Sequence, residues 1–101
     1  MARILKQDAE RMLADVSRGR EFRCSDGRML RNMVDLEKGL QTMTDETFSY
    51  HSNADKTDFS NWVNDVIGDE KLARDLRKSP DRIVAAKNVA SRIAFLDSKL
   101  G

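Results

Sequence analysis

Apolar residues recur at spacings of three and four positions along most of this chain, in segments separated by residues that begin or end helices. This spacing places apolar side chains on one face of an α-helix. Three segments show it most clearly, at residues 2–18, 59–67 and 80–98. Their apolar positions are Leu5, Ala9, Met12, Leu13 and Val16, then Phe59, Trp62, Val63, Val66 and Ile67, then Ile83, Ala86, Val89, Ala90, Ile93 and Leu96. The pattern predicts a compact all-α bundle of five or six helices.

Glycines and capping residues set the expected helix boundaries in the first half of the chain. Gly19 suits the left-handed backbone that ends a helix, so we expect the first helix to stop there. Asn32 is a good N-cap for a second helix, and Gly39 inside that helix predicts a closely packed neighbour. Thr44 is the expected N-cap of a third helix, which ends near residues 51–52. The second helix is expected to turn these apolar side chains inward: Val34, Leu36, Leu40 and Met43.

Similar signals mark the helices of the second half. Asp58 is the expected N-cap of a fourth helix that Gly68 ends, and Asp69 is the expected N-cap of a fifth. Ser79 and Pro80 form a strong start signal, with Ser at the cap and Pro at the first helical position. The last helix is therefore predicted to begin there and to run to about residue 98.

Residues 20–31 interrupt the helical pattern. The turn sequence Ser25-Asp26-Gly27 lies in the middle of them, and Gly27 can take the positive φ that a tight turn requires. Either a short β-hairpin near residues 22–30 or an ordered loop fits this pattern. A lone hairpin is only marginally stable, so we expect this segment to pack on the helices.

Size and composition fit one folded domain. The chain has 101 residues, of which 40% are hydrophobic and 35% are charged. The hydrophobic share is sufficient for a core, and no low-complexity tract is present. Cys24 is the only cysteine, which excludes a disulfide within the chain and a thiolate zinc site. The first residues lack the apolar run of a secretion signal, and no stretch is apolar enough to span a membrane, so we expect a cytoplasmic protein that does not enter a membrane.

Charge is distributed unevenly along the chain. Residues 1–32 carry eight Lys or Arg against five Asp or Glu, residues 33–70 carry two against nine, and residues 71–101 carry eight against three. The balances are therefore +3, −7 and +5, with a total of +1. Two interpretations stay open: the basic ends fold against the acidic middle, or they form a face for a polyanion or for head-to-tail self-association.

Residues 48–69, FSYHSNADKTDFSNWVNDVIGD, contain the only His, the only Trp and the only Tyr of the chain. A transition-metal site needs three or four convergent ligands, and one His is too few. A calcium loop starting at Asn53 would need Gly where Asp58 stands and Glu where Asn64 stands. Cys24 and His51 could meet in space as nucleophile and base, but a lone Cys before a turn is typically a small buried hydrophobe.

We therefore expect no catalytic residue, no metal site and no cofactor. The same polar residues can instead hold a tight connection between helices, with the Trp indole donating to a main-chain oxygen. The residues of this predicted structural junction are Tyr50, His51, Asn53, Asp58 and Trp62.

Short motifs in residues 22–77 carry a resemblance to a known family. They are a Ser-Asp-Gly-Arg turn, an Asp-Glu-x-Phe-x-Tyr-His-x-Asn segment, and Asp-Phe-x-Asn-Trp-Val followed by Gly-Asp and Leu-Ala. The matching residues are Ser25, Asp26, Gly27 and Arg28, then Asp45, Glu46, Phe48, Tyr50, His51 and Asn53, then Asp58, Phe59, Asn61, Trp62, Gly68, Asp69, Leu72 and Ala73. In these motifs the chain resembles a small archaeal and bacterial domain family of unknown function.

The resemblance covers about residues 22–77, which would form a family-like core within the one domain of residues 1–101. The helices at 1–19 and 80–100 would flank that core and pack on it. Family members usually have Val where this chain has Ser52. The resemblance implies no activity.

Two surfaces are candidates for contact with a partner. Five arginines surround the turn after the first helix, and Arg suits bidentate contact with phosphate. These arginines are Arg18, Arg20, Arg23, Arg28 and Arg31. The last helix is rich in Ala, which permits close approach of another helix, and Phe95 is expected to lie away from its inward stripe. The candidate partner residues on that helix are Ile83, Val89, Ile93 and Phe95.

These features together predict a non-enzymatic protein-interaction or regulatory module that binds a protein partner or forms a homodimer through its first and last helices. The alternative is a small nucleic-acid- or ribosome-binding protein that uses its arginine-rich surface.

Overall fold

A computed structural model of the chain describes residues 4–101. The elements, in order, are helix α1 (Lys6–Leu13), strands β1 (Phe22–Arg23) and β2 (Met29–Leu30), helices α2 (Met33–Thr42), α3 (Asp45–His51) and α4 (Asp58–Trp62), the π-helical segment η1 (Val63–Ile67), and helices α5 (Glu70–Arg77) and α6 (Arg82–Ser98). The predicted all-α bundle with one short hairpin is confirmed.

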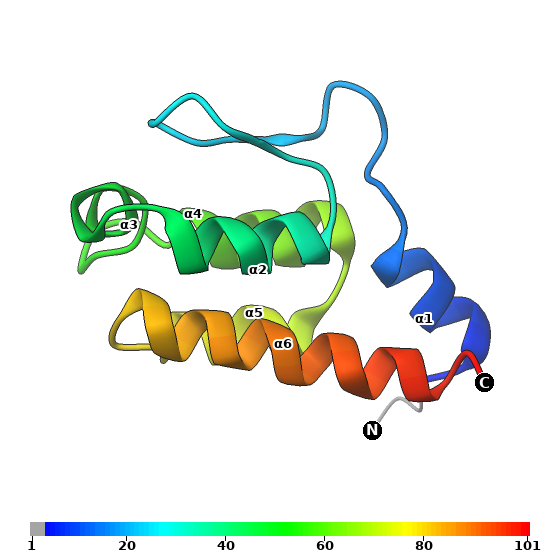
Figure 1. The fold of residues 1–101 in the computed structure, drawn as a ribbon. Helices are drawn as coiled ribbons and strands as arrows, with labels where there is room; N and C mark the ends of the chain where they lie inside the picture. The colour runs from blue at the N-terminus through cyan, green and yellow to red at the C-terminus, as the bar shows by residue number, and fades with distance from the viewer. Residues whose placement is uncertain (1–3) are drawn as a thin grey trace.

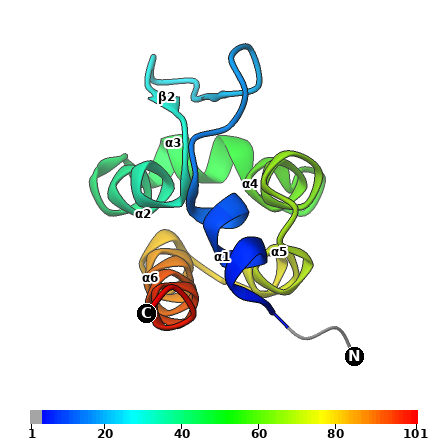
Figure 2. The same cartoon turned by 90° about the vertical axis from the view of Figure 1, so that its right-hand side faces the viewer.

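The main helices form two layers. Helices α2 and α4 lie in one layer, and α5 and α6 lie in the other (Figure 1). In the end view, these four helices surround the interior and α1 lies across one end of the bundle (Figure 2). The long helix α6 packs on α2 and also contacts α1 and α5. The hairpin lies outside the bundle, with β2 against α2.

One apolar core unites these elements, because the inward faces of α1, α2, α4, α5 and α6 converge. Its larger fully buried side chains are Met33, Leu36, Leu40, Val63, Leu72, Val89 and Leu96. The expectation that Val34 faces inward is wrong, since this side chain is 41% exposed. Met33 takes the inward position in the first turn of α2 instead.

The hairpin is short and closely packed. Its strands are antiparallel, with Phe22 opposite Leu30. Gly27 forms the turn with a φ of 97°. A Cβ atom added at Gly39 would lie 3.2 Å from the Leu30 Cδ2 atom, which is closer than ordinary contact. This confirms the close neighbour that a glycine inside α2 predicts.

Three of the predicted caps are confirmed, because each depends only on residues within one turn. The side chains of Asn32, Thr44 and Asp69 accept hydrogen bonds from the main-chain N–H groups three residues on, at 2.8 Å, 3.1 Å and 3.1 Å. Gly68 ends η1 in the left-handed conformation, with a φ of 86°.

The first helix is shorter than predicted. It ends at Leu13 because the chain then becomes extended and the Val16 N–H donates to the main-chain oxygen of Arg31, 2.8 Å away. Gly19 does have a positive φ, but it serves a turn closed by a hydrogen bond from the Arg20 N–H to the Ser17 oxygen. Residues 2 and 3 of the predicted helix lie outside the described residues.

Two later boundaries also differ from the prediction. Asp58 is the first residue of α4 rather than its cap, because its carboxylate is directed to His51. The last helix begins at residue 82, with Asp81 as its N-cap. Ser79 instead closes the end of α5, where its hydroxyl donates to the Asp75 oxygen at 2.8 Å.

Candidate functional site

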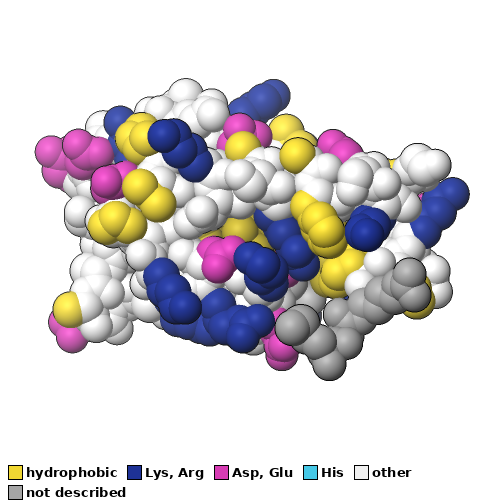
Figure 3. Space-filling model, turned by 90° about the horizontal axis from the view of Figure 1, so that it is seen from below, with side chains coloured by type: hydrophobic (Ala, Val, Ile, Leu, Met, Phe, Trp, Pro, Cys, Tyr) yellow, Lys and Arg dark blue, Asp and Glu magenta, His cyan; other side chains and the backbone are white. Residues whose placement is uncertain are grey.

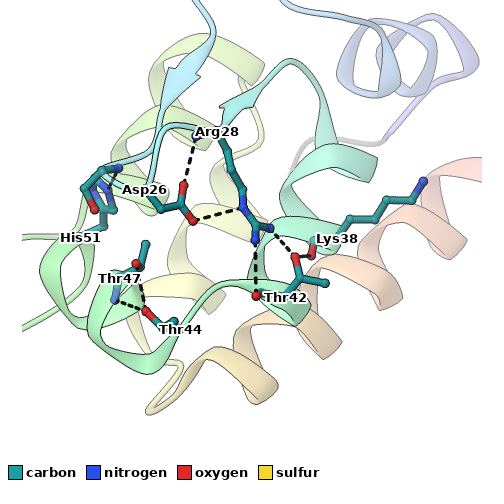
Figure 4. A network of polar contacts seen from close by, with 8 residues as sticks. Asp26, Arg28, Lys38, Thr42, Thr44, Thr47 and His51 are labelled. Atoms are coloured by element: carbon teal, nitrogen blue, oxygen red, sulfur yellow. Dashed lines mark hydrogen bonds and ion pairs between the residues drawn. The ribbon is translucent and has the colours of Figure 1, made fainter.

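Two long-range contacts fasten the hairpin region to the helices, one just before β1 and one at the turn between the strands. The indole N–H of Trp62 donates to the main-chain oxygen of Arg20 at 2.8 Å, as a buried Trp requires. On the other side, the Arg28 guanidinium contacts the Asp26 carboxylate at 3.1 Å and donates to the hydroxyl and main-chain oxygen of Thr42 at the end of α2 (Figure 4). The Ser-Asp-Gly-Arg turn is thereby tied to α2.

His51 makes the third contact between the hairpin and the helices (Figure 4). Its Nε2 atom accepts a hydrogen bond from the Ser25 main-chain N–H at 2.9 Å, and its Nδ1 atom lies 2.9 Å from the Asp58 carboxylate. A main-chain N–H can only donate, so Nε2 carries no proton. Nδ1 is then the protonated nitrogen, and His51 is neutral.

The surroundings of His51 limit what it can do chemically. The imidazole is 5% exposed and packs against Phe22 and Phe59, with ring centroids 5.1 and 5.4 Å away. The Nε2 lone pair that a general base would use is already engaged by Ser25. Cys24, which precedes Ser25 in the chain, is buried, and burial raises the pKa of its thiol, so the thiolate that a nucleophile needs is disfavoured.

Two other residues of the predicted junction, Asn53 and Tyr50, take no part in the hydrogen bonds of the His51 ring. Asn53 organises the connection after α3, because its Oδ1 atom accepts from the main-chain N–H groups of Asp55 and Lys56 at 2.8 and 3.1 Å. Its amide donates back to the Ser49 oxygen at 2.8 Å. Tyr50 is 57% exposed, and the Lys56 ammonium lies 4.0 Å from the centre of its ring. Tyr50 therefore belongs to the surface of the junction rather than to its interior.

The predicted arginine surface divides into two kinds of residue. Arg28 is occupied by Asp26 and Thr42. The other four are exposed and form no ion pair within residues 4–101: Arg18, Arg20, Arg23 and Arg31.

Glu21 lies among these arginines and reduces their combined charge. Main-chain hydrogen bonds at Glu21 and Gly19, followed by the nearby charges of Arg23 and Arg31, hold the pKa of the Glu21 carboxyl below its ordinary value. The Gly19 N–H donates to this carboxylate at 2.8 Å. The surface is therefore positive but contains one firmly ionised carboxylate.

The four candidate partner residues of α6 do not share one environment. Val89 is fully buried in the protein's own core, and Ile93 is half-buried beside it. Ile83 and Phe95 are 49% and 41% exposed. Helix α1 contacts α6 within the chain, so part of the face proposed for self-association is already covered.

Phe95 lies at a groove between α5 and α6, where Lys and Arg side chains gather beside hydrophobic ones (Figure 3). The groove consists of two adjoining hollows of about 700 and about 400 Å³. Both are lined by Lys71, Arg92 and Phe95. The larger hollow is also lined by Ile4, Met12, Asn64, Gly68, Asp69, Glu70, Arg74 and Lys99.

A buried ion pair forms one wall of this groove. Asp69, whose side chain is 1% exposed, contacts Arg92 through two hydrogen bonds of 2.7 and 3.0 Å. The same carboxylate caps α5 by accepting from the Leu72 N–H. The pair joins the start of α5 to the middle of α6, and it holds the Arg92 guanidinium 5.0 Å from the centre of the Phe95 ring.

Sequence reasoning did not identify this groove. Asp69 and Arg92 are 23 positions apart, and a cap is the only role that local pattern assigns to Asp69. The residues that could have indicated the groove are Lys71 and Arg74 on the predicted fifth helix, together with Arg92 and Phe95 on the predicted last helix.

Two further observations, on metal ligands and on membrane spans, apply to residues 4–101 only. Residues 4–101 contain no group of three or more His, Cys, Asp or Glu side chains placed to hold a metal ion. No helix in that part of the chain has the length and apolar character needed to cross a membrane.

Comparison with protein families, with curated proteins and with solved structures finds no match to this chain.

Proposed function

We propose that this protein is a non-enzymatic protein-interaction module that binds its partner at the α5–α6 groove. The observation that carries the proposal is the exposed Phe95 ring, which lies between two cations at the groove. Aromatic and Arg side chains in a hollow are the residue types that contribute most to binding at protein interfaces.

The hydrogen bonding of the other candidate centre also favours binding over catalysis. Both ring nitrogens of His51 are engaged, Nε2 by the Ser25 N–H of the hairpin turn and Nδ1 by the Asp58 carboxylate of α4. Within residues 4–101, every buried side-chain nitrogen and oxygen has a hydrogen-bond partner. No buried polar group is thus left over for a reacting molecule in the part of the chain that is described.

A photo-crosslinking residue at position 95 tests the proposal in the cytosol of the source organism. The matched control is the same residue at position 34, where Val34 is equally exposed but lies outside the groove. We expect a protein adduct, or a dimer, from position 95 alone. Excess unmodified protein should suppress the adduct, and excess Phe95→Ala protein should not. Equal adducts from both positions would contradict the proposal.

Nucleic-acid binding is a second candidate function, favoured by Arg18, Arg20, Arg23 and Arg31, which have no ion-pair partner among the described residues. It predicts binding to labelled RNA or duplex DNA that weakens steeply with salt. Replacing Arg20, Arg23 and Arg31 by Gln should abolish the binding. Replacing the exposed Lys6, Lys38 and Lys87 by Gln removes the same charge elsewhere and should have little effect.

A further inference from the structure

We propose that the α5–α6 groove binds a short acidic segment of a partner protein, with one apolar side chain of that segment placed against Phe95. The inference rests on the interaction function proposed above and specifies the chemistry of the partner. Three features of the groove lead to it: the pairing of its charges, its apolar surface and its length.

The charges that line the groove are paired unequally. Arg92 is neutralised by Asp69, and Lys71 contacts Asp75 at 2.7 Å. Arg74 and Lys99 have no ion-pair partner among residues 4–101. Among the carboxylates that line the groove, Glu70 alone also lacks an ion-pair partner within those residues. The lining therefore has an excess of cations, which a carboxylate-bearing segment would complement.

The apolar part of the groove lies beside these cations. The Phe95 ring is 41% exposed, with the Arg92 guanidinium and the Lys99 ammonium 5.0 and 5.1 Å from its centre. Ile4 and Met12 line the same hollow. An apolar side chain placed here would remove the ring from water while Lys99, which has no ion-pair partner among residues 4–101, stays available to a carboxylate.

The cations are spread along the helices rather than gathered at one point. The N-terminus of α5, which could otherwise attract phosphate, is capped by Asp69 and followed by Glu70. Arg92 is held by two hydrogen bonds to Asp69 and cannot turn to a new ligand without breaking them. This arrangement disfavours a compact phosphate cluster and favours carboxylates distributed along a segment.

The lining residues of α6, together with Lys99, which follows the helix, extend from Asn88 to Lys99. At 1.5 Å per residue this is about 16 Å, which an extended segment of about five residues would cover. The groove thus matches a short linear segment, and its hollows are within the size range of small binding pockets.

A fluorescent peptide of about six residues, with one Phe among Glu and Asp residues, tests the inference in a binding titration with the 101-residue chain. Two control peptides replace the Phe by Ser or all acidic residues by Gln. We expect binding of the first peptide only, weakened by salt. Phe95→Ala should weaken it about tenfold. Arg74→Glu with Lys99→Glu should abolish it, whereas Lys38→Glu with Lys87→Glu, outside the groove, should not.

Three results would overturn the inference. The first is equal binding of all three peptides, or binding of the acidic peptide to the Arg74→Glu, Lys99→Glu variant as tightly as to the unmodified protein. The second is displacement of the peptide by ATP but not by sodium chloride of the same ionic strength, which would identify a phosphate ligand. The third is self-association in sedimentation that Phe95→Ala removes, which would assign the groove to a second copy.

The two proposals fail in different ways. Crosslinking from position 95 without peptide binding would leave the interaction function standing and reject the acidic segment. Peptide binding without specific crosslinking would show that the groove accepts an acidic segment and would reject the partner contact at position 95. Because Phe95 is on the surface, circular dichroism and the melting temperature should show that its Ala variant stays folded.

Discussion

The Nδ1 atom of His51 lies 2.9 Å from the Oδ2 atom of Asp58, and this contact determines which nitrogen of the imidazole carries its proton. The carboxylate accepts, so Nδ1–H donates to it. The opposite nitrogen is thereby free to accept from the Ser25 N–H, and the end of α3 becomes the attachment point of the hairpin.

The tautomer of His51 is the first prediction. We expect ¹⁵N NMR at neutral pH to show a protonated Nδ1 and an unprotonated Nε2, because the Ser25 N–H can only donate and Nε2 must therefore accept. A neutral ring with its proton on Nε2 would contradict the assignment, since two donors would then face each other at Ser25.

Replacing His51 tests how much the hairpin attachment contributes to stability. His51→Ala should lower the free energy of unfolding by about 2 to 4 kcal/mol, because it leaves the Ser25 N–H without its acceptor and removes a buried ring. His51→Gln places a carbonyl oxygen near the former Nε2 position and should lose less. Urea unfolding of both variants measures the difference, and equal losses would show that the acceptor at Ser25 contributes nothing.

The indole of Trp62 provides a second test of the attachment. Trp62→Phe keeps a buried ring but removes the donor to the Arg20 oxygen, so we expect a loss of about 1 kcal/mol or more in the free energy of unfolding. Amide hydrogen exchange should accelerate mainly in residues 20–31. Tyr50→Phe is the matched control, because Tyr50 is exposed, and it should change stability by less than about 0.5 kcal/mol.

The buried pair of Asp69 and Arg92 predicts strong coupling between two substitutions. Arg92→Met leaves the Asp69 carboxylate buried without its counter-charge and should cost about 3 to 5 kcal/mol of stability. Adding Asp69→Asn removes that charge while keeping a residue that caps α5 well, so the double variant should recover part of the loss. Denaturant unfolding of the two single variants and the double variant measures the coupling; additive losses would contradict it.

The buried Cys24 thiol predicts how stability depends on alkaline pH. Burial raises the pKa of this thiol above its ordinary value of 9.0. As the pH rises past that value, the unfolded chain loses its thiol proton before the folded chain does, so stability falls. Between about pH 8 and about pH 10, the native protein should therefore lose more stability than the Cys24→Ala variant, which has no thiol. Parallel thermal melts of both proteins across this range give the comparison, and identical slopes would refute it.

The parts of the fold that sequence patterns predicted depend on residues within one helical turn. The caps at Asn32, Thr44 and Asp69 are of this kind, because each side chain bonds to an N–H group three residues ahead. The turn at Gly27 is equally local, since only its own φ and its immediate neighbours determine it. The all-α class followed from these signals and from the spacing of apolar residues, whereas the pattern of residues 22–30 fits either a hairpin or an ordered loop.

Boundaries were predicted wrongly where a distant partner competes with a local signal. The first helix ends early because the Val16 N–H finds the Arg31 oxygen, 15 positions away in the chain. Asp58 looks like a cap from its neighbours, but its carboxylate is directed to His51 on the preceding helix. A local propensity of about 1 kcal/mol gives way when packing supplies a better partner.

The sequence by itself determined which segments form helices, where the turn at Gly27 lies, and which residues are apolar enough to be buried. The tertiary structure alone decided which groups meet: the His51 ring with the Ser25 main-chain N–H, the Asp69 carboxylate with Arg92, and Arg74 and Lys99 in one hollow with Phe95. The physical reason is that capping and periodicity act over three or four residues, whereas these contacts depend on how whole helices pack, and many arrangements share the same pattern of apolar residues.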